Sequence, residues 1–247
     1  MMEFTKRNIL AYVAVKEEGD FRGMMTRIRE TGDVAREDFN SMDDPGSFIC
    51  VLDGSYPESL KHVMAPPIVM FTDGDESLLS AKVKKICVVS SGEQNGEGLI
   101  EIVSSTDDDA IIVASRSNKM LKRLATEANR RMIIVAREGL DVAKRELGPV
   151  YDAVIKAGGL FISEHPKGVE PNPDRSVNSH RVAAGLSDVM VVSSIGQHHH
   201  AMLEVKIAIE MGKDVYVMPA PKDLANNSLI KEGAYLIDCA EDLKDGK

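Results

Sequence analysis

Apolar runs and amphipathic segments alternate along most of the chain. Strand-like runs lie at 48–52, 65–71, 86–90, 110–114, 131–136, 159–163, 188–193, 214–218 and 234–237, and helical patterns lie at about 97–105, 117–130, 141–157, 181–186 and 200–211. Strands that are apolar on both faces are typical of parallel sheets with helices on each side. The pattern therefore predicts an α/β fold with a doubly wound, mostly parallel sheet.

The N-terminal part of the chain has a different pattern. Helical spacing of apolar positions predicts helices at 4–17, at 21–30 and, shorter, after Asp33. Thr5 is the expected cap of the first, and a turn cluster from Met42 to Gly46 follows the third. We therefore expect two domains, a small helical module at 1–46 and the sheet domain at 47–247.

The segment from Phe161 to Val192 is where a ligand is expected. It reads as a strand that ends in Ser163 and Glu164, a loop over 165–181, a short helical turn, and a strand that ends before Ser193. In open α/β sheets, ligands bind outside the carboxyl ends of the strands, where the strand order reverses. These strand ends and the loop between them therefore predict a binding site.

Composition argues against several classes of protein. No apolar run approaches the length of a membrane span, and the N-terminus lacks the pattern of a signal peptide. Cys50, Cys87 and Cys239 lie far apart, without the spacing of a zinc site or a disulfide framework. We expect a cytoplasmic protein with reduced cysteines and no contact with a membrane.

Charge is distributed unevenly. The net charge of −9 argues against a generally basic nucleic-acid coat but not against a local patch. Cationic side chains concentrate between Arg116 and Arg145, whereas acidic residues gather elsewhere, as at Asp107–Asp109. The cationic segment is either a solvated helix face or a surface that faces phosphates.

Two loops that follow strands and open predicted helices are candidates for anion binding. Residues 91–98 are rich in glycine but fit neither the dinucleotide nor the P-loop pattern, and Glu93 and Glu97 would repel a phosphate. The better candidate contains Ser115, Arg116, Ser117, Asn118 and Lys119, which offer hydroxyls, an amide and two cations. A plain helix cap at Ser117 or Asn118 accounts for one of these residues but not for both cations.

The histidine run at 198–200 suggests a metal site, but three adjacent histidines cannot all reach one ion from a regular element. We expect an exposed helix start or a loop that faces a ligand instead. Ser163 and His165 lie close together on one extended segment and would point apart, so no Ser-His-Asp catalytic group is predicted. The residues indicate no metal, no catalytic group and no cofactor.

Three blocks of the chain share the order and spacing of a known family. They are Tyr56–Leu60 with Pro66 and Pro67, Gly158–Gly168 with Arg181–Ser187, and Ala208–Pro219 with Asn227–Ala234. Together they resemble the DNA-processing protein A family (DprA/Smf), over about 48–237, and the helices at 1–42 resemble its N-terminal module. The resemblance implies an extended Rossmann-like fold.

The resemblance also implies a function. Members bind single-stranded DNA on a homodimeric Rossmann-like core and deliver the strand to a recombinase, without catalytic turnover. For this chain it implies Arg181 at a matching position and Lys167 in the same loop. Ser163, Glu164 and His180 complete the predicted DNA-binding or phosphate-binding set around them.

The loops that carry the family's function are altered here. The altered positions are Val89–Gly92 without the family's arginine, Ala114–Met120 in place of a glycine-rich loop, Ser179–Arg181 in place of Arg-Asn-Arg, and His198–Ala201 in place of Ser-Gly-Ser. The chain also stops at Lys247, before the winged-helix domain of many members. Arg116 and Lys119 lie in a matching loop without being matching residues, so their role is inferred from charge alone.

Three functions stay open. The first is non-enzymatic binding of single-stranded DNA, mainly through phosphates because aromatic residues make up only 4% of the chain and Trp is absent. The second is nucleotide binding or nucleoside-phosphate hydrolysis, with Glu164 as the acid–base group and Arg181 on the phosphate. Related phosphoribohydrolases have a Pro-Gly-Gly-x-Gly-Thr-x-x-Glu loop, which Ser194–Glu204 does not match. The third is a scaffold that binds only a protein partner.

Overall fold

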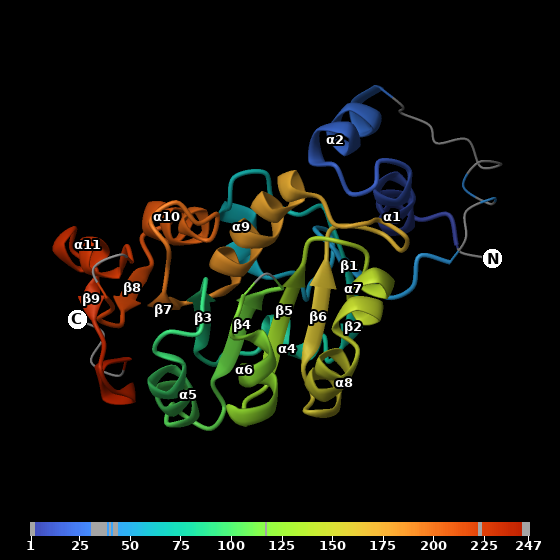
Figure 1. Cartoon of the computed structure of the whole chain (residues 1–247). Helices are drawn as coiled ribbons and strands as arrows, with labels where there is room; N and C mark the ends of the chain where they lie inside the picture. Colours follow the sequence, from blue (N-terminus) through green and yellow to red (C-terminus); the bar gives the residue numbers. More distant parts are fainter. Residues whose placement is uncertain are drawn as a thin grey trace.

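One sheet runs through the middle of the molecule (Figure 1). The computed structural model describes residues 3–30, 39, 41, 44–116, 118–221 and 224–243. Within these residues the sheet has nine strands in the order β1-β2-β6-β5-β4-β3-β7-β8-β9. The strands are β1 (Phe48–Cys50), β2 (Val69–Gly74), β3 (Lys85–Ser90), β4 (Ile111–Ser115), β5 (Met132–Ala136), β6 (Leu160–Ser163), β7 (Val189–Ser194), β8 (Asp214–Val217) and β9 (Tyr235–Leu236).

Parallel pairing dominates this sheet. Every neighbouring pair from β6 across to β9 is parallel, whereas β1 pairs with β2, and β2 with β6, in the antiparallel sense. The helices are α1 (Lys6–Lys16), α2 (Phe21–Glu30), α4 (Ser77–Ser80), α5 (Gly96–Ser104), α6 (Leu121–Glu127), α7 (Leu140–Leu147), α8 (Pro149–Lys156), α9 (Ser176–Leu186), α10 (Met202–Glu210) and α11 (Asn226–Lys231), with 3₁₀ turns at Glu58–His62, Pro173–Arg175 and Ala240–Leu243. The predicted α/β class with a mostly parallel sheet is confirmed. None of the helices in the described ranges has the length and apolar character that crossing a membrane requires.

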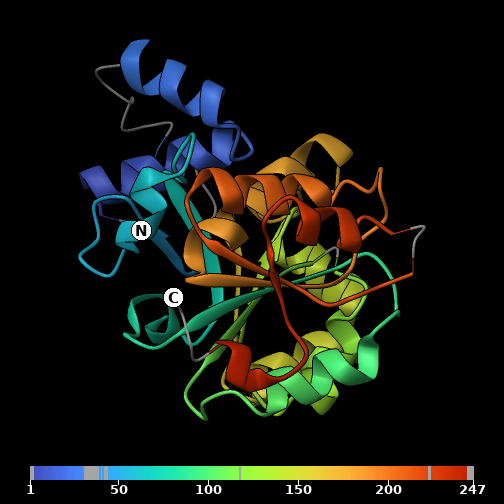
Figure 2. The same cartoon turned by 90° about the vertical axis from the view of Figure 1, so that its left-hand side faces the viewer.

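Side chains that alternate along each strand divide the core between two faces of the sheet. On β3, Cys87 and Val89 belong to the cluster that packs against α9 and α10, whereas Ile86 and Val88 belong to the cluster that packs against α5 and α6. Figure 2 shows these two helical layers on opposite sides of the sheet. Because both faces are covered, every residue of β3 is buried, which explains the continuous apolar run in the sequence.

The helix predicted over 141–157 is two helices, α7 and α8. Gly148 between them has a φ of 48°, in the left-handed region that favours glycine, and Pro149 begins α8. Proline suits the first position of a helix because the N–H that it lacks has no partner there. Both halves are amphipathic, so periodicity alone predicts one helix.

Two other boundaries differ near the predicted site. The helix expected over 117–130 begins only at Leu121, so the cationic loop after β4 is longer than the pattern predicts. The turn expected from Arg181 is the second half of α9, which includes part of the predicted loop. The short helix expected after Asp33 falls on residues that, except for 39 and 41, lie outside the described ranges.

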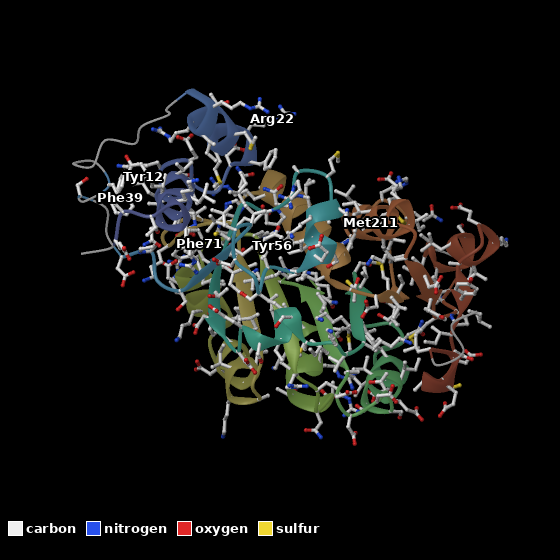
Figure 3. The ribbon with its side chains drawn as sticks, turned by 180° about the vertical axis from the view of Figure 1, so that it is seen from behind. Tyr12, Arg22, Phe39, Tyr56, Phe71 and Met211 are labelled. Atoms are coloured by element: carbon white, nitrogen blue, oxygen red, sulfur yellow. The ribbon has the colours of Figure 1, made fainter. Side chains whose placement is uncertain are left out.

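The N-terminal helices lie beside β1 and β2, at one end of the sheet (Figures 1 and 3). Helix α1 begins at the expected cap, where Oγ1 of Thr5 accepts a hydrogen bond from the N–H of Asn8. A third apolar cluster joins Tyr12 and Phe39 to Phe71 of β2, and Figure 3 labels these three residues. The helices therefore pack directly on the sheet, while the division of the chain at residue 46 stays a prediction.

Gly19, between α1 and α2, makes a close approach to the sheet domain. Its φ is 76°, and a Cβ at this position would lie 2.0 Å from the carbonyl oxygen of Glu164. Beside it, Nδ1 of His165 donates a hydrogen bond to the carbonyl of Glu18, at 2.7 Å. The C-terminal end of α1 is therefore fixed against the residues that follow β6.

We expect Gly19→Ala to lower the free energy of unfolding by roughly 2–5 kcal/mol, because left-handed backbone costs roughly 1–2 kcal/mol and the overlap with Glu164 roughly 1–3 kcal/mol. Gly212→Ala is the matched control, since Gly212 has a φ of 69° and no atom within 4 Å of an added Cβ. The control should cost only about 1–2 kcal/mol. Urea unfolding measures both variants, and equal losses would contradict the close approach.

Candidate functional site

The strand order reverses between β3 and β7. Strands β4, β5 and β6 lie on one side of β3, and β8 and β9 lie on the far side of β7. The loops that follow β3 to β8 therefore meet at one edge of the sheet, which we call the carboxyl edge. In Figure 1, α9 lies above the arrowheads that mark this edge. Ligands of open α/β sheets bind at such an edge.

Glu164 and Arg181 form a buried ion pair at the carboxyl edge. Glu164 directly follows β6 and Arg181 belongs to α9, and their side chains are 8% and 5% exposed. Nη2 of Arg181 donates to both carboxylate oxygens, at 2.7 and 2.9 Å. Burial raises the pKa of Glu164, and the charge of Arg181 opposes that shift. Nη1 of Arg181 is buried and has no hydrogen-bond partner among the described residues.

Glu138, in the loop after β5, forms a second buried ion pair. Nε of Arg116 lies 2.5 Å from Oε1 of Glu138, whose side chain is 0% exposed. Arg116 also pairs with Glu146 of α7. Burial raises the pKa of Glu138, and the charges of Arg116 and Arg137 oppose that shift. Arg116 therefore lies against the protein instead of extending into solvent.

The third buried carboxylate is Glu204 of α10. Its Oε2 accepts hydrogen bonds from Nδ1 of His180 at 2.7 Å and from the hydroxyl of Ser115 at 3.3 Å. Its Oε1 accepts a hydrogen bond from the thiol of Cys87 at 3.3 Å. Burial, with the charge of Glu204, raises the pKa of the Cys87 thiol well above its usual range. Residues of β3, β4, α9 and α10 therefore meet at one polar point inside the molecule.

The glycine-rich loop after β3 bridges neighbouring strand ends. The N–H of Gly196 donates to Oγ of Ser91 at 2.9 Å. The side-chain amide of Asn95 donates to the carbonyls of Ser193 and Pro219, at 2.8 and 2.7 Å. This loop therefore holds together the ends of β7 and β8.

The histidine run lies between β7 and α10. The ring centroids of His199 and His200 are 4.0 Å apart, and the ring of His200 lies 5.7 Å from that of His180. Burial lowers the pKa of His199 and of His200, and neighbouring positive charges, including that of Lys119, lower them further. In the part of the chain that the structure describes, no group of three or more His, Cys, Asp or Glu is placed to hold a metal ion. The histidine run therefore places the ring nitrogens of His199 and His200 near positively charged side chains, including that of Lys119.

The family follows from comparison with known proteins. The sequence pattern of DNA recombination-mediator protein A matches residues 47–246. The chain belongs to this family. The DNA processing protein DprA of Streptococcus pneumoniae (strain ATCC BAA-255 / R6) is 25% identical over 203 residues, which are 78% of this chain and 71% of the relative. That of Bacillus subtilis (strain 168) is 28% identical over 200 residues, 76% of this chain and 67% of the relative.

Solved structures of family members have the same fold. DNA processing protein A from Streptococcus pneumoniae superposes with a TM-score of 0.78 over 99% of both chains, at 20% identity. The protein from Helicobacter pylori has a TM-score of 0.67 over 80% of this chain and 94% of that one, at 18% identity. At such identity the likeness shows the fold. The predicted fold class and the predicted family are confirmed.

Most of the DNA-binding residues that we predict for this family member have buried side chains. Arg116, Glu164, Arg181, Ser115 and His180 take part in the contacts with the three carboxylates. Ser163 is also buried, with its hydroxyl donating to the carbonyl of Glu138 at 2.7 Å, and the amide of Asn118 donates to the carbonyl of Val88 at 2.5 Å. These two side chains hold loops in place.

Lys119 and Lys167 are exposed at the carboxyl edge of this DNA recombination-mediator protein A member. They lie apart, because Lys119 follows β4 whereas Lys167 follows β6 and lines a cavity of about 340 Å³ with Lys144 and His165. Ser117 lies outside the described residues. The binding role of all ten residues stays a prediction.

Glu138 and Glu204 are not among the site residues predicted from the sequence. Glu138 follows a buried strand closely, as Glu164 does, and this position was the available signal. Glu204 shares a helical face with the buried Val205 and Ala208. An acidic residue on an apolar helical face indicates a buried carboxylate that needs a partner.

Arg181→Met should lower the free energy of unfolding by about 3–5 kcal/mol, because it leaves the carboxylate of Glu164 buried without a partner. Adding Glu164→Leu should recover most of that loss. A double-mutant cycle in urea measures the coupling between the two side chains.

The control cycle is Arg145→Met with Glu170→Leu. This pair is 60% and 62% exposed, so its coupling should be only about 0.2–1 kcal/mol. If the two cycles gave the same coupling energy, the ion pair of Glu164 and Arg181 would not be the buried contact described above.

Proposed function

We propose that this protein binds single-stranded DNA in DNA processing and recombination, without catalysing a reaction. The proposal rests on the two exposed lysines, Lys119 and Lys167, at the carboxyl edge of a chain from the DNA recombination-mediator protein A family. A protein with a net charge of −9 attracts a phosphate backbone only where positive charge is concentrated. Lys119 and Lys167 provide positive charge at two points along the edge where ligands of such sheets bind.

The arginines have a different part in this proposal. Arg116 and Arg181 are paired with buried carboxylates, so most of their charge is already compensated inside the protein. The unpartnered Nη1 of Arg181 is the part of that side chain that remains for a phosphate oxygen. The lysines therefore supply the electrostatic attraction, and Arg181 supplies a fixed donor.

The relatives support this reading. The Helicobacter pylori protein binds single-stranded DNA, and the Streptococcus pneumoniae and Bacillus subtilis relatives are DNA processing proteins. We extend to this chain the same role, together with a cytoplasmic homodimer that passes the strand to a recombinase. Because aromatic residues make up 4% of the chain and Trp is absent, base stacking contributes little and salt weakens binding strongly.

The alternative of a nucleoside-phosphate hydrolase needs an acid–base group that reaches a substrate. Glu164, the candidate from the sequence, is buried, and both of its oxygens accept hydrogen bonds from Arg181. This carboxylate fixes α9 to the end of β6 through Arg181, and it is not positioned to transfer protons to a ligand. The geometry therefore favours binding over catalysis.

Charge reversal at Lys119 and Lys167 tests the proposal. The variant Lys119→Glu/Lys167→Glu should weaken binding of a labelled single-stranded oligonucleotide by at least about tenfold at low salt, and lower the salt dependence by roughly one phosphate contact per lysine. Fluorescence anisotropy over a series of NaCl concentrations measures both effects.

Lys82→Glu/Lys156→Glu is the matched control. It makes the same change of net charge at two exposed lysines of the opposite edge, since Lys82 precedes β3 and Lys156 ends α8 shortly before β6. The control should bind nearly as the unmodified protein does. Equal losses in both variants, or an affinity that does not change with salt, would overturn the proposal.

A further inference from the structure

Three imidazole rings from two elements lie together at the carboxyl edge. His199 and His200 belong to the loop after β7, and His180 belongs to α9. The positive charges that act on them come from Lys119 after β4 and Arg137 after β5. Two segments therefore supply the rings, and the charges of two others act on them.

Two of these rings have a fixed orientation. Nδ1 of His180 donates to Glu204, and Nε2 of the same ring is buried and has no hydrogen-bond partner in the described ranges. Nδ1 of His199 accepts a hydrogen bond from the N–H of Ala201 at 3.1 Å, so the neutral ring carries its hydrogen on Nε2. A buried polar atom without a partner calls for an explanation, and a bound ligand is one that fits a site beside other donors. Nε2 of His180 is such an atom.

The charges around the rings favour an anion over a metal cation. The permanent charges that lower the pKa of His199 and His200 are those of Lys119 and Arg137, and both are cationic. The carboxylate in contact with the cluster is that of Glu204, which already accepts hydrogen bonds from three other side chains. A metal ion would be repelled, whereas a phosphate oxygen suits charged N–H donors.

We propose that His199, His200 and Nε2 of His180, together with Lys119, form a phosphate-binding subsite whose affinity increases when the rings are protonated. The subsite rests on the proposed function, because it binds a phosphate of the same DNA strand. The phosphate is either an internal diester or the terminal phosphate of a strand. The same chemistry recognises both.

Proton uptake accompanies binding at this subsite. In the free protein, burial and the neighbouring positive charges hold the pKa of His199 and of His200 below the usual value, so both rings are neutral near neutral pH. A bound phosphate compensates the positive charge and raises these pKa values. Affinity therefore rises as the pH falls through the raised values and levels off below the values of the free protein.

The test compares His199→Gln/His200→Gln with His198→Gln, an exposed neighbour in the same run. Each linked proton changes affinity by at most about tenfold per pH unit, so we expect the unmodified protein and His198→Gln to bind a single-stranded oligonucleotide roughly three to ten times more tightly at about pH 6 than at about pH 7.5. The double variant should lose most of this gain. Identical pH profiles in all three proteins would overturn the subsite.

A second measurement does not depend on DNA. Inorganic phosphate should shift the imidazole NMR signals of His199 and His200 and leave that of His198 unchanged. If the unmodified protein did not bind DNA but phosphate still shifted the NMR signals of His199 and His200, the proposed function would fail and the subsite would stand. If the signals responded to Zn²⁺ and not to phosphate, the subsite would fail.

Oligonucleotides with and without a 5′-phosphate separate the two sources of phosphate. An equal gain at low pH for both assigns the subsite to an internal diester. A gain confined to the phosphorylated strand assigns it to a strand end.

Discussion

Buried carboxylates at the carboxyl edge are the constraint on which the rest of this structure depends. An ionised carboxylate is tolerated away from water only with a compensating charge and hydrogen bonds. Glu138 with Arg116 and Glu164 with Arg181 have both, and Glu204 with His180 is held by hydrogen bonds. Each pair joins two separate segments of the chain. The positions of the loops after β4, β5 and β6, and of the middle of α9, follow from these contacts.

These pairs change how Arg116 and Arg181 are interpreted. An arginine in a motif of a DNA-binding family is readily interpreted as a phosphate contact, but Arg181 is first the partner of Glu164. Its removal would leave a buried charge and disturb α9 before any contact with DNA is lost. A loss of binding at Arg181 is therefore ambiguous by itself. The exposed Lys119 and Lys167 distinguish electrostatic attraction from structural support.

The order of strands and helices could be predicted from the sequence because helices cover both faces of the sheet. Strands buried on both faces appear in the sequence as continuous apolar runs. The boundary between α7 and α8 at Gly148 could not be predicted, because two amphipathic helices meet there without a change in the helical spacing of apolar residues. The sequence placed Ser163, Glu164 and Arg181 at the carboxyl edge but did not predict the ion pair of Glu164 and Arg181, since pairing is decided by contacts between segments far apart in the chain. Glu204 was not predicted either, although an acidic residue on an apolar helical face is a signal of a buried carboxylate.

The N-terminal helices belong to the same arrangement, although they lie far along the sheet from the reversal of strand order. His165 follows Glu164 directly, and burial lowers its pKa, so the neutral ring donates through Nδ1 to the carbonyl of Glu18. Arg175, just before α9, donates to the carboxylate of Glu18 at 2.7 Å. Glu18 therefore contacts the chain on both sides of the loop between β6 and α9. Because close-packed contacts of this kind transmit strain, we expect a shift of α1 to disturb the Glu164–Arg181 pair as well.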